Sequence, residues 1–187
     1  RFTGLFRDVM IYKQPSLHIQ DLKIDTDIDL DTNKSVLSCV CKMSSNESHT
    51  LQAKLYDPQG NIVWNGNMQD TFEIPVENTC LWSSEFPNLY QLELVLYDTN
   101  NEIIETIQEQ VGFRKFTLEY GIMKLNGKRI VFHGINRHEW DSKTGRCLSQ
   151  EQMEEDIHIL KSLNINAIRT SHYPNNSYWY KLCDQYG

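Results

Sequence analysis

The sequence predicts a mostly β fold in which an immunoglobulin-like β-sandwich is followed by a shorter α/β tail. From Leu17 to Phe113, apolar and polar residues alternate in short runs separated by turn signals. Strict alternation is typical of antiparallel strands with one buried and one solvated face. About seven such strands within ~100 residues are typical of an immunoglobulin-like sandwich. After Asn126 the pattern changes to an apolar strand, an amphipathic helix and a second apolar strand.

Within each run of the sandwich, apolar residues of one parity are expected to form the core. The turn Asp57-Pro58-Gln59-Gly60 separates two of these runs. No Cys…Trp…Cys pattern is present, which excludes an antibody-type domain. The expected inward residues are Leu22, Ile24, Ile28 and Leu30; Leu37, Cys39, Cys41 and Met43; Leu51, Ala53 and Leu55; Phe72, Ile74 and Val76; Leu92, Leu94 and Leu96; and Ile103, Ile107, Val111 and Phe113.

Two strands of the tail each end in polar and ring-bearing residues. The first is expected at residues 130–135, where the consecutive apolar residues 130–132 indicate a strand buried on both faces, and it leads to residues 136–139. The second, at residues 165–168, leads to residues 169–173 and is closed by Pro174. In an α/β barrel, the carboxyl ends of such strands form the active-site face.

Helix signals lie between and after these strands. Ser149 and Gln152 have the spacing of a capping box, which predicts a helix start. Asn164 can adopt the left-handed conformation that ends a helix. A second helix is expected at residues 176–186, and Asn126-Gly127 favours a tight type I′ hairpin before the first strand. The apolar side of the first helix is expected to consist of Met153, Ile157, Leu160 and Leu163.

Composition restricts the class of protein. The chain has 187 residues and a net charge of −7, from 18 Lys and Arg against 25 Asp and Glu, which disfavours nucleic acid and anionic membranes as partners. No apolar run is long enough to span a bilayer. Five cysteines without paired metal-ligand spacing argue against a disulfide framework and a zinc site, and fit a reducing, cytoplasmic compartment. Because the chain starts at Arg1 and no signal peptide leads it, we expect an upstream part to have been removed.

Four segments resemble a known family. Residues 136–139 (Asn-Arg-His-Glu), 166–174 (Asn-Ala-Ile-Arg-Thr-Ser-His-Tyr-Pro) and 182–187 (Leu-Cys-Asp-Gln-Tyr-Gly) are similar to glycoside hydrolase family 2, and within it to the β-galactosidases. Residues 4–9 (Gly-Leu-Phe-Arg-Asp-Val) resemble the end of that family's first, sugar-binding domain. The match touches both ends of the chain, and its longest specific run is Arg-Thr-Ser-His-Tyr-Pro-Asn.

The resemblance implies a division of the chain into three parts. Residues 1–14 would be the terminal strand of a preceding sugar-binding jelly-roll domain. Residues 15–114 would be the immunoglobulin-like sandwich. Residues 115–187 would be the incomplete N-terminal part of a (β/α)8 catalytic barrel, containing the first two βα units of a truncated TIM barrel.

The resemblance also assigns substrate-binding roles. It implies that His138 donates to sugar hydroxyls or to charge at the glycosidic centre, and that His172 contacts a galactosyl hydroxyl. Arg169 would orient the nucleophilic carboxylate, a role that suits a rigid guanidinium fork. The alternatives are a hydrogen-bonded loop histidine and a structural salt-bridge arginine. For Tyr173 and Trp140, stacking on a sugar and packing at the rim remain equal alternatives.

No catalytic residue is expected within the chain. A retaining glycosidase needs two carboxyl groups about 5 Å apart, one as acid/base and one as nucleophile. In the family both glutamates, and the metal ligands, come from barrel strands beyond Gly187, so Glu139 is expected to lie behind the site. The chain itself would hold no metal or cofactor, whereas Mg and Na are implied for the full-length parent. We therefore expect an internal fragment of a β-galactosidase that is inactive alone.

The expected partners follow from the incomplete barrel. Two barrel strands without neighbours have unpaired edges, so residues 122–187 are expected to pack on another copy of the chain or to be poorly ordered. The remainder of the barrel, a homo-oligomer and the galactoside substrate of the parent are the candidate partners. Two alternatives remain open: a β-glucuronidase or β-mannosidase parent from the same family, and a non-catalytic interaction module built on the sandwich.

Overall fold

The computed structural model of the chain describes residues 4–187. They divide into two compact units: Lys13–Arg129, and residues 4–12 together with Ile130–Gly187. Within the described range, no helix combines the length and the apolar character needed to cross a membrane.

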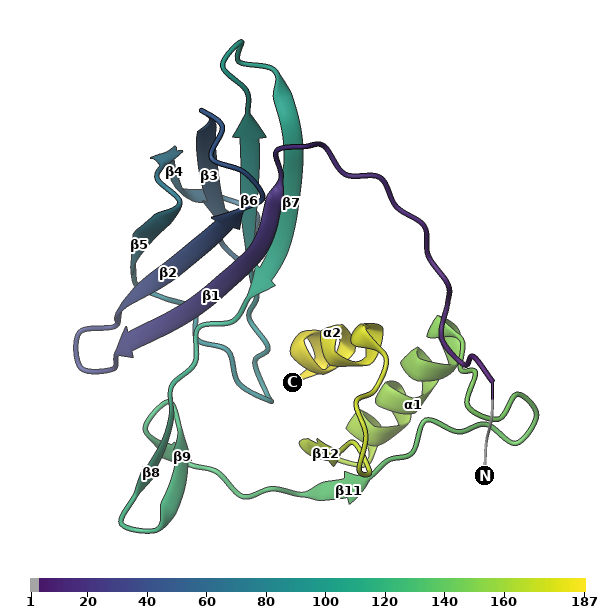
Figure 1. Cartoon of the computed structure of the whole chain (residues 1–187). Coiled ribbons are helices and arrows are strands. Elements are labelled where there is room, and N and C mark those ends of the chain that lie inside the picture. The colour runs from purple at the N-terminus through teal and green to yellow at the C-terminus, as the bar shows by residue number, and fades with distance from the viewer. Residues whose placement is uncertain (1–3) are drawn as a thin grey trace. The chain divides into compact units, whose positions relative to one another are not determined.

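The unit Lys13–Arg129 contains a sandwich of two antiparallel sheets, which confirms the predicted fold class (Figure 1). One sheet has the strand order β1-β2-β5 and the other has the order β4-β3-β6-β7. The strands are β1 (Ile19–Asp29), β2 (Lys34–Met43), β3 (Thr50–Tyr56), β4 (Ile62–Met68), β5 (Thr71–Glu77), β6 (Tyr90–Tyr97) and β7 (Ile103–Val111).

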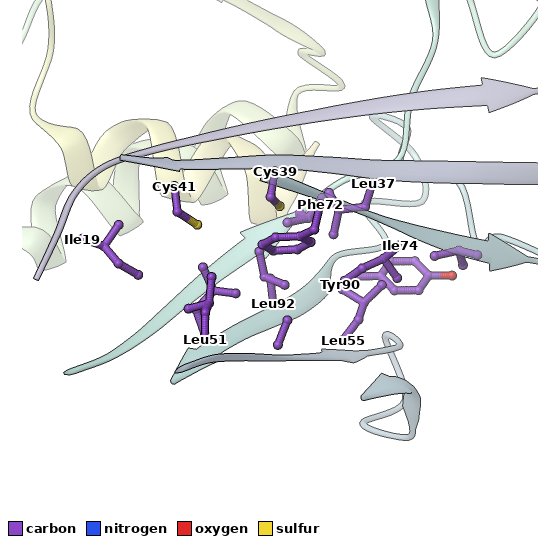
Figure 2. Close-up of a cluster of buried hydrophobic side chains, with 14 of the residues drawn as sticks. Ile19, Leu37, Cys39, Cys41, Leu51, Leu55, Phe72, Ile74, Tyr90 and Leu92 are labelled. Atoms are coloured by element: carbon purple, nitrogen blue, oxygen red, sulfur yellow. The ribbon is translucent and has the colours of Figure 1, made fainter. Parts of the chain in front are cut away.

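The alternating residues of the two sheets form one apolar core. Figure 2 shows side chains such as Leu37 and Phe72 on one side of this core and Leu51 and Leu92 on the other. Burial raises the pKa of the Cys39 thiol to about 12, so this cysteine stays protonated and packs as an apolar side chain.

The loop before β6 is fixed by a tyrosine. The hydroxyl of Tyr90 accepts a hydrogen bond from the backbone N–H of Cys80 at 3.0 Å, and its ring packs edge-on against Phe113 at 4.9 Å between centroids. A tyrosine near the start of the equivalent strand that bonds back to the preceding backbone is typical of immunoglobulin-like sandwiches.

Strand β4 was not identified from the sequence. It is an edge strand that pairs only with β3, and none of its residues is fully buried. Its centre is Asn65-Gly66-Asn67, and these residue types are depleted in strands. The strand is therefore held by backbone pairing rather than by an apolar pattern. The expectations that Leu30 and Ile103 face the core were also wrong, because β1 ends at Asp29 and both side chains are exposed, Ile103 at 64%.

A three-stranded hairpin sheet follows the sandwich, formed by β8 (Phe116–Glu119), β9 (Ile122–Leu125) and β10 (Lys128–Arg129). Asn126 and Gly127 have φ values of 52° and 76°, as the predicted type I′ turn requires. The Asn126 side chain donates to the Trp82 carbonyl at 3.0 Å and accepts from the Lys115 backbone N–H at 2.9 Å. These bonds place the hairpin in the compact unit of the sandwich, whereas the assignment of residues 115–187 to one barrel domain stays a prediction.

The second unit has the predicted order of strand, helix, strand and helix. Its elements are β11 (Gly134–Asn136), α1 (Gln150–Ser162), β12 (Ala167–Arg169) and α2 (Ser177–Tyr186). Strands β11 and β12 pair in parallel (Figure 1).

The first strand of this unit begins later than expected: β11 starts at Gly134, whereas the sequence predicts a strand from residue 130. The side chain of Asn166 accepts from the backbone N–H of His133 at 2.8 Å and donates to the carbonyl of Val131 at 3.0 Å. The stretch before β11 is thus held by the side chain of Asn166 and by one backbone hydrogen bond, from the Asn166 N–H to the His133 carbonyl at 3.1 Å, and Val131 and Phe132 are exposed.

Helix α1 begins and ends as predicted. Both hydrogen bonds of the capping box between Ser149 and Gln152 are present, and Asn164 follows the helix with φ 59°. Leu163 was expected on the apolar side but is 65% exposed. The small core of this unit consists of Met153 and Ile157 from α1 and Trp179 and Leu182 from α2.

Residues 4–14 form neither helix nor strand. The expectation of a terminal strand at residues 1–14 is not met there, and residues 1–3 lie outside the described part. A strand needs a partner for its backbone hydrogen bonds, and these residues are paired with none in the described range. Their assignment to a preceding domain stays a prediction.

Candidate functional site

The carboxyl ends of β11 and β12 lie side by side. Asn136 is in register with Arg169, and the backbone N–H of Arg137 donates to the Arg169 carbonyl at 2.9 Å. The close approach depends on Gly134, where an added Cβ would lie 3.1 Å from the Ala167 carbonyl oxygen. The residues that follow both strands therefore leave the sheet at the same edge.

Two histidines meet at this edge. The ring centroids of His138 and His172 are 6.1 Å apart, with the rings nearly perpendicular at 80°, and both side chains are exposed. Tyr173 lies beside them, with its hydroxyl 3.3 Å from His138 Nδ1. The structure thus brings His138 together with His172, 34 positions later, and with Tyr173, 35 positions later. The two histidines are the substrate-binding candidates from the sequence.

Arg169 stands at the end of β12 and is exposed. Within residues 4–187 no ion pair joins its guanidinium to a carboxylate, so the alternative of a structural salt bridge has no partner in the described part.

The turn after β12 has a strained backbone. Ser171 and His172 have φ values of 24° and 76°, in the left-handed region that side chains other than glycine rarely adopt. Each such residue costs about 1–3 kcal/mol, and such strain is concentrated at functional sites. Here the strained pair consists of the buried Ser171 and the exposed His172.

Glu139 follows His138 but is not a free carboxylate. It is 2% exposed, accepts from the backbone N–H of Asn176 at 2.7 Å and pairs with the guanidinium of Arg7. Arg7 also donates to the Pro174 carbonyl at 3.4 Å. Glu139 therefore links Arg7 to the start of α2, and its place behind the substrate site stays a prediction.

Arg137 is the second buried charge of the unit. Its Nε and Nη2 donate to one oxygen of Asp156 at 2.9 and 2.7 Å, and its Nη1 donates to Asn175 at 3.2 Å. Its guanidinium lies 3.6 Å from the centroid of the Trp179 ring. A desolvated cation over an indole face is a strong stacking contact, so Arg137 holds the end of β11 against both helices.

Comparisons with known proteins identify the family. The model described as Glycosyl hydrolases family 2 matches residues 17–114, and the one described as Glycosyl hydrolases family 2, TIM barrel domain, matches residues 116–187. The chain belongs to glycosyl hydrolase family 2. The recognised resemblance and the start of a TIM barrel after a sandwich are thereby confirmed.

Curated relatives match the chain over its whole length. The β-galactosidase of Halalkalibacterium halodurans is 45% identical over 100% of this chain and 19% of the relative. The β-galactosidase of Clostridium acetobutylicum is 42% identical over 100% of this chain and 21% of the relative. The chain therefore spans about a fifth of the length of these relatives.

Similar solved structures come from the same family. A β-D-glucuronidase of Dictyoglomus thermophilum has a TM-score of 0.84 at 29% identity, covering 92% of this chain and 28% of that one. An FMN-binding β-glucuronidase of Facaelibacterium prausnitzii L2-6 has a TM-score of 0.86 at 26% identity, covering 93% of this chain and 29% of that one.

In this member of family 2, Tyr173 and Trp140 differ in their surroundings. The Tyr173 hydroxyl accepts from the backbone N–H of Glu139 at 3.0 Å, and the guanidinium of Arg146 lies 4.8 Å from its ring centroid. Trp140 is 48% exposed. Tyr173 is thus held by two contacts and Trp140 is half exposed, and stacking on a sugar and packing at the rim stay alternatives for both.

Within residues 4–187, no group of three or more His, Cys, Asp or Glu side chains is arranged to hold a metal ion. The Mg and Na implied for a full-length family 2 β-galactosidase stay a prediction for that protein.

A pocket of about 540 Å³ lies at the N-terminal ends of α1 and α2. Its lining includes Arg7, Ser149, Asn176 and Lys181, and it includes none of the three candidate substrate-binding residues. The candidate site is thus the exposed edge after β11 and β12 and not this pocket.

Proposed function

We propose that the chain is part of a retaining β-galactosidase that hydrolyses terminal β-D-galactose residues from β-galactosides. The main support is the convergence of His138 and His172, 6.1 Å apart, at the carboxyl ends of two parallel strands. In barrel enzymes these ends carry the chemistry. The curated relatives at 42% and 45% identity are β-galactosidases, which supports the galactoside over other sugars.

The proposed roles follow from exposure and donor type. Both imidazoles can donate or accept hydrogen bonds with sugar hydroxyls, and their exposed positions leave them accessible to a ligand. Arg169, beside them at the strand end, supplies a planar fork that suits a carboxylate. Its proposed partner is the nucleophilic glutamate of a later barrel strand.

The 187-residue chain alone is proposed to be inactive. Retaining hydrolysis needs two carboxyl groups ~5–5.5 Å apart across the glycosidic bond. Glu139 is buried and bound by Arg7 and Asn176, and Asp156 is paired with Arg137, so neither is poised for this chemistry. Both catalytic glutamates, the remainder of the barrel and the Mg and Na sites are proposed to belong to a longer protein, which can form a homo-oligomer. All five cysteines are free thiols, which supports a cytoplasmic location.

A β-glucuronidase is the second candidate, because the solved structures with TM-scores of 0.84 and 0.86 carry that name. Their identities of 29% and 26% are lower than those of the β-galactosidase relatives.

The test is a chimera in which this chain replaces the matching segment of the Halalkalibacterium halodurans β-galactosidase. We expect the chimera to hydrolyse a chromogenic β-galactoside and not the matching β-glucuronide. His138→Asn and His172→Asn should each lower kcat/KM about 10²–10³-fold, as loss of a transition-state hydrogen bond does. Turnover of the glucuronide alone would reject the galactoside, and galactoside turnover by the isolated chain would reject its proposed inactivity.

A further inference from the structure

The hydroxyl of Tyr173 lies between two groups of the neighbouring strand end. Its oxygen is 3.0 Å from the backbone nitrogen of Glu139 and 3.3 Å from Nδ1 of His138. The rings of Tyr173 and His138 have centroids 5.8 Å apart. One phenol therefore contacts both the main chain and the imidazole of the residue proposed to bind substrate.

The direction of one of these hydrogen bonds is fixed, and it favours one direction for the other. A backbone N–H can only donate, so the Tyr173 oxygen accepts from Glu139. The phenol has a single proton left to donate, and His138 Nδ1 is the neighbour that can accept it. If Nδ1 carried the hydrogen instead, the phenol proton would be left without an acceptor at this contact. A neutral imidazole that accepts at Nδ1 carries its hydrogen on Nε2.

The phenol is itself held in place. The guanidinium of Arg146 lies 4.8 Å from the Tyr173 ring centroid and 3.9 Å from that of Phe6. The Glu139 backbone N–H that donates to this phenol is also held in place, because the buried carboxylate of Glu139 is bound by Arg7 and by the backbone of Asn176. A rigid support of this kind is what positions an exposed side chain within the tolerance that catalysis needs.

We propose that Tyr173 is a positioning residue that holds His138 in the Nε2–H tautomer, so that this ring presents an N–H donor to the ligand beside His172. The proposal rests on the proposed function for the identity of the ligand, a sugar hydroxyl oxygen. Its structural half, the tautomer, does not depend on that function. A tyrosine that only packed at the rim would leave the tautomer unchanged on loss of its hydroxyl.

The first experiment measures the tautomer in the whole 187-residue chain by ¹⁵N NMR of its imidazoles, under conditions that keep them neutral. His138 is assigned with His138→Gln. We expect one Nε2–H form in the wild type and a mixture of both tautomers in Tyr173→Phe. The control is Tyr180→Phe, which removes a hydroxyl that also accepts from a backbone N–H, that of Asn175 at 2.9 Å, and should leave His138 unchanged.

An Nδ1–H form of His138 in the wild type would overturn the proposal, even if Tyr173→Phe failed to fold. So would an unchanged, purely Nε2–H form in a folded Tyr173→Phe chain.

The second experiment is a double-mutant cycle in the chimera. We expect Tyr173→Phe to lower kcat/KM about tenfold with His138 present and to have almost no effect in the His138→Asn background. Equal effects in both backgrounds would reject a role through His138. A chimera that hydrolyses no galactoside would instead reject the proposed function, while the tautomer measurement would still decide the role of Tyr173.

Discussion

The two compact units are stabilised in different ways. The sandwich buries one large apolar core that draws on both sheets, with Leu37, Ala53, Leu55, Ile74 and Leu96 fully buried. The second unit has a small core between two helices and two buried charged residues, Arg137 and Glu139.

The difference shows what each region needs for order. Apolar burial contributes about 25 cal/mol per Å² without requiring a particular orientation, so the sandwich can be stable through its core alone. A buried charge stabilises only when its partners are in place, and losing one partner is costly. The second unit therefore depends on a few specific contacts, and it leaves Val131, Phe132 and Ile135 exposed. The expectation that residues 122–187 need a neighbouring copy or are poorly ordered stays a prediction.

The largest effect is expected from a change in the sandwich core. Leu94→Ala should lower the free energy of unfolding of the sandwich by about 2–5 kcal/mol, because Leu94 is 1% exposed and its loss leaves a cavity. Hydrogen exchange of the β3 and β6 amides measures it. Leu118→Ala, at a side chain 67% exposed, is the control and should change stability by less than about 0.5 kcal/mol. Equal effects of the two would contradict a core-stabilised sandwich.

A smaller effect is expected when the second unit loses its buried cation. Arg137→Ala should destabilise it by about 2–4 kcal/mol through the lost Trp179 stack and hydrogen bonds. The Asp156 side chain left behind is 43% exposed, so hydration limits the loss. Hydrogen exchange of the α1 and α2 amides measures this loss of stability. Arg137→Met keeps the length without the charge; wild-type stability in that variant would show that the charge is not required.

Between pH 6 and pH 8 the stability of the sandwich should change modestly, through His49. The Glu47 carbonyl at Nδ1 and the Asp70 carboxylate at Nε2 raise the pKa of His49 above its usual 6.5. A raised folded-state pKa means that the stabilisation is complete below pH ~6.5 and is lost as the pH rises through the folded value. The change should be under about 1 kcal/mol, as for other partly exposed pairs. Urea unfolding at pH 6 and pH 8 tests it, and His49→Gln should remove this component.

The smallest effect is expected at Ser35 in β2. Its hydroxyl is buried and has no hydrogen-bond partner within residues 4–187. Removing an unsatisfied polar group avoids its desolvation cost, so Ser35→Ala should leave stability unchanged or raise it by up to about 1 kcal/mol. A loss above 1 kcal/mol in urea unfolding would show that the hydroxyl has a partner, such as a bound water.

Most of the sandwich could be predicted because each strand buries alternate residues. Strand β4 could not be predicted. It is an edge strand with Asn65-Gly66-Asn67 at its centre, and the backbone pairing that holds it leaves no side-chain pattern in the sequence. The first strand of the tail starts later than predicted, because an apolar run looks alike whether its backbone pairs with a strand or bonds to a side chain, here that of Asn166.

The candidate site was only partly predictable. His138 and His172 follow apolar strands, so their neighbourhood could be expected from β-α-β order and the family resemblance. The contacts that hold these histidines and the strand ends in place could not be predicted. Arg7 and Glu139 are 132 positions apart, and the contact between Tyr173 and His138 depends on the strained backbone at residues 171–172. Contacts of this range leave no local pattern in a sequence.

The parallel pairing of β11 with β12 also sets the order in which this unit can assemble. His133 and Asn166, which bond at the start of the pair, are 33 positions apart, and α1 occupies the interval. A helix forms within about a microsecond, whereas closing a long loop between strands costs entropy that only later contacts recover. We therefore expect the two imidazoles to meet after α1 has formed, which would make this edge one of the later parts of the unit to fold.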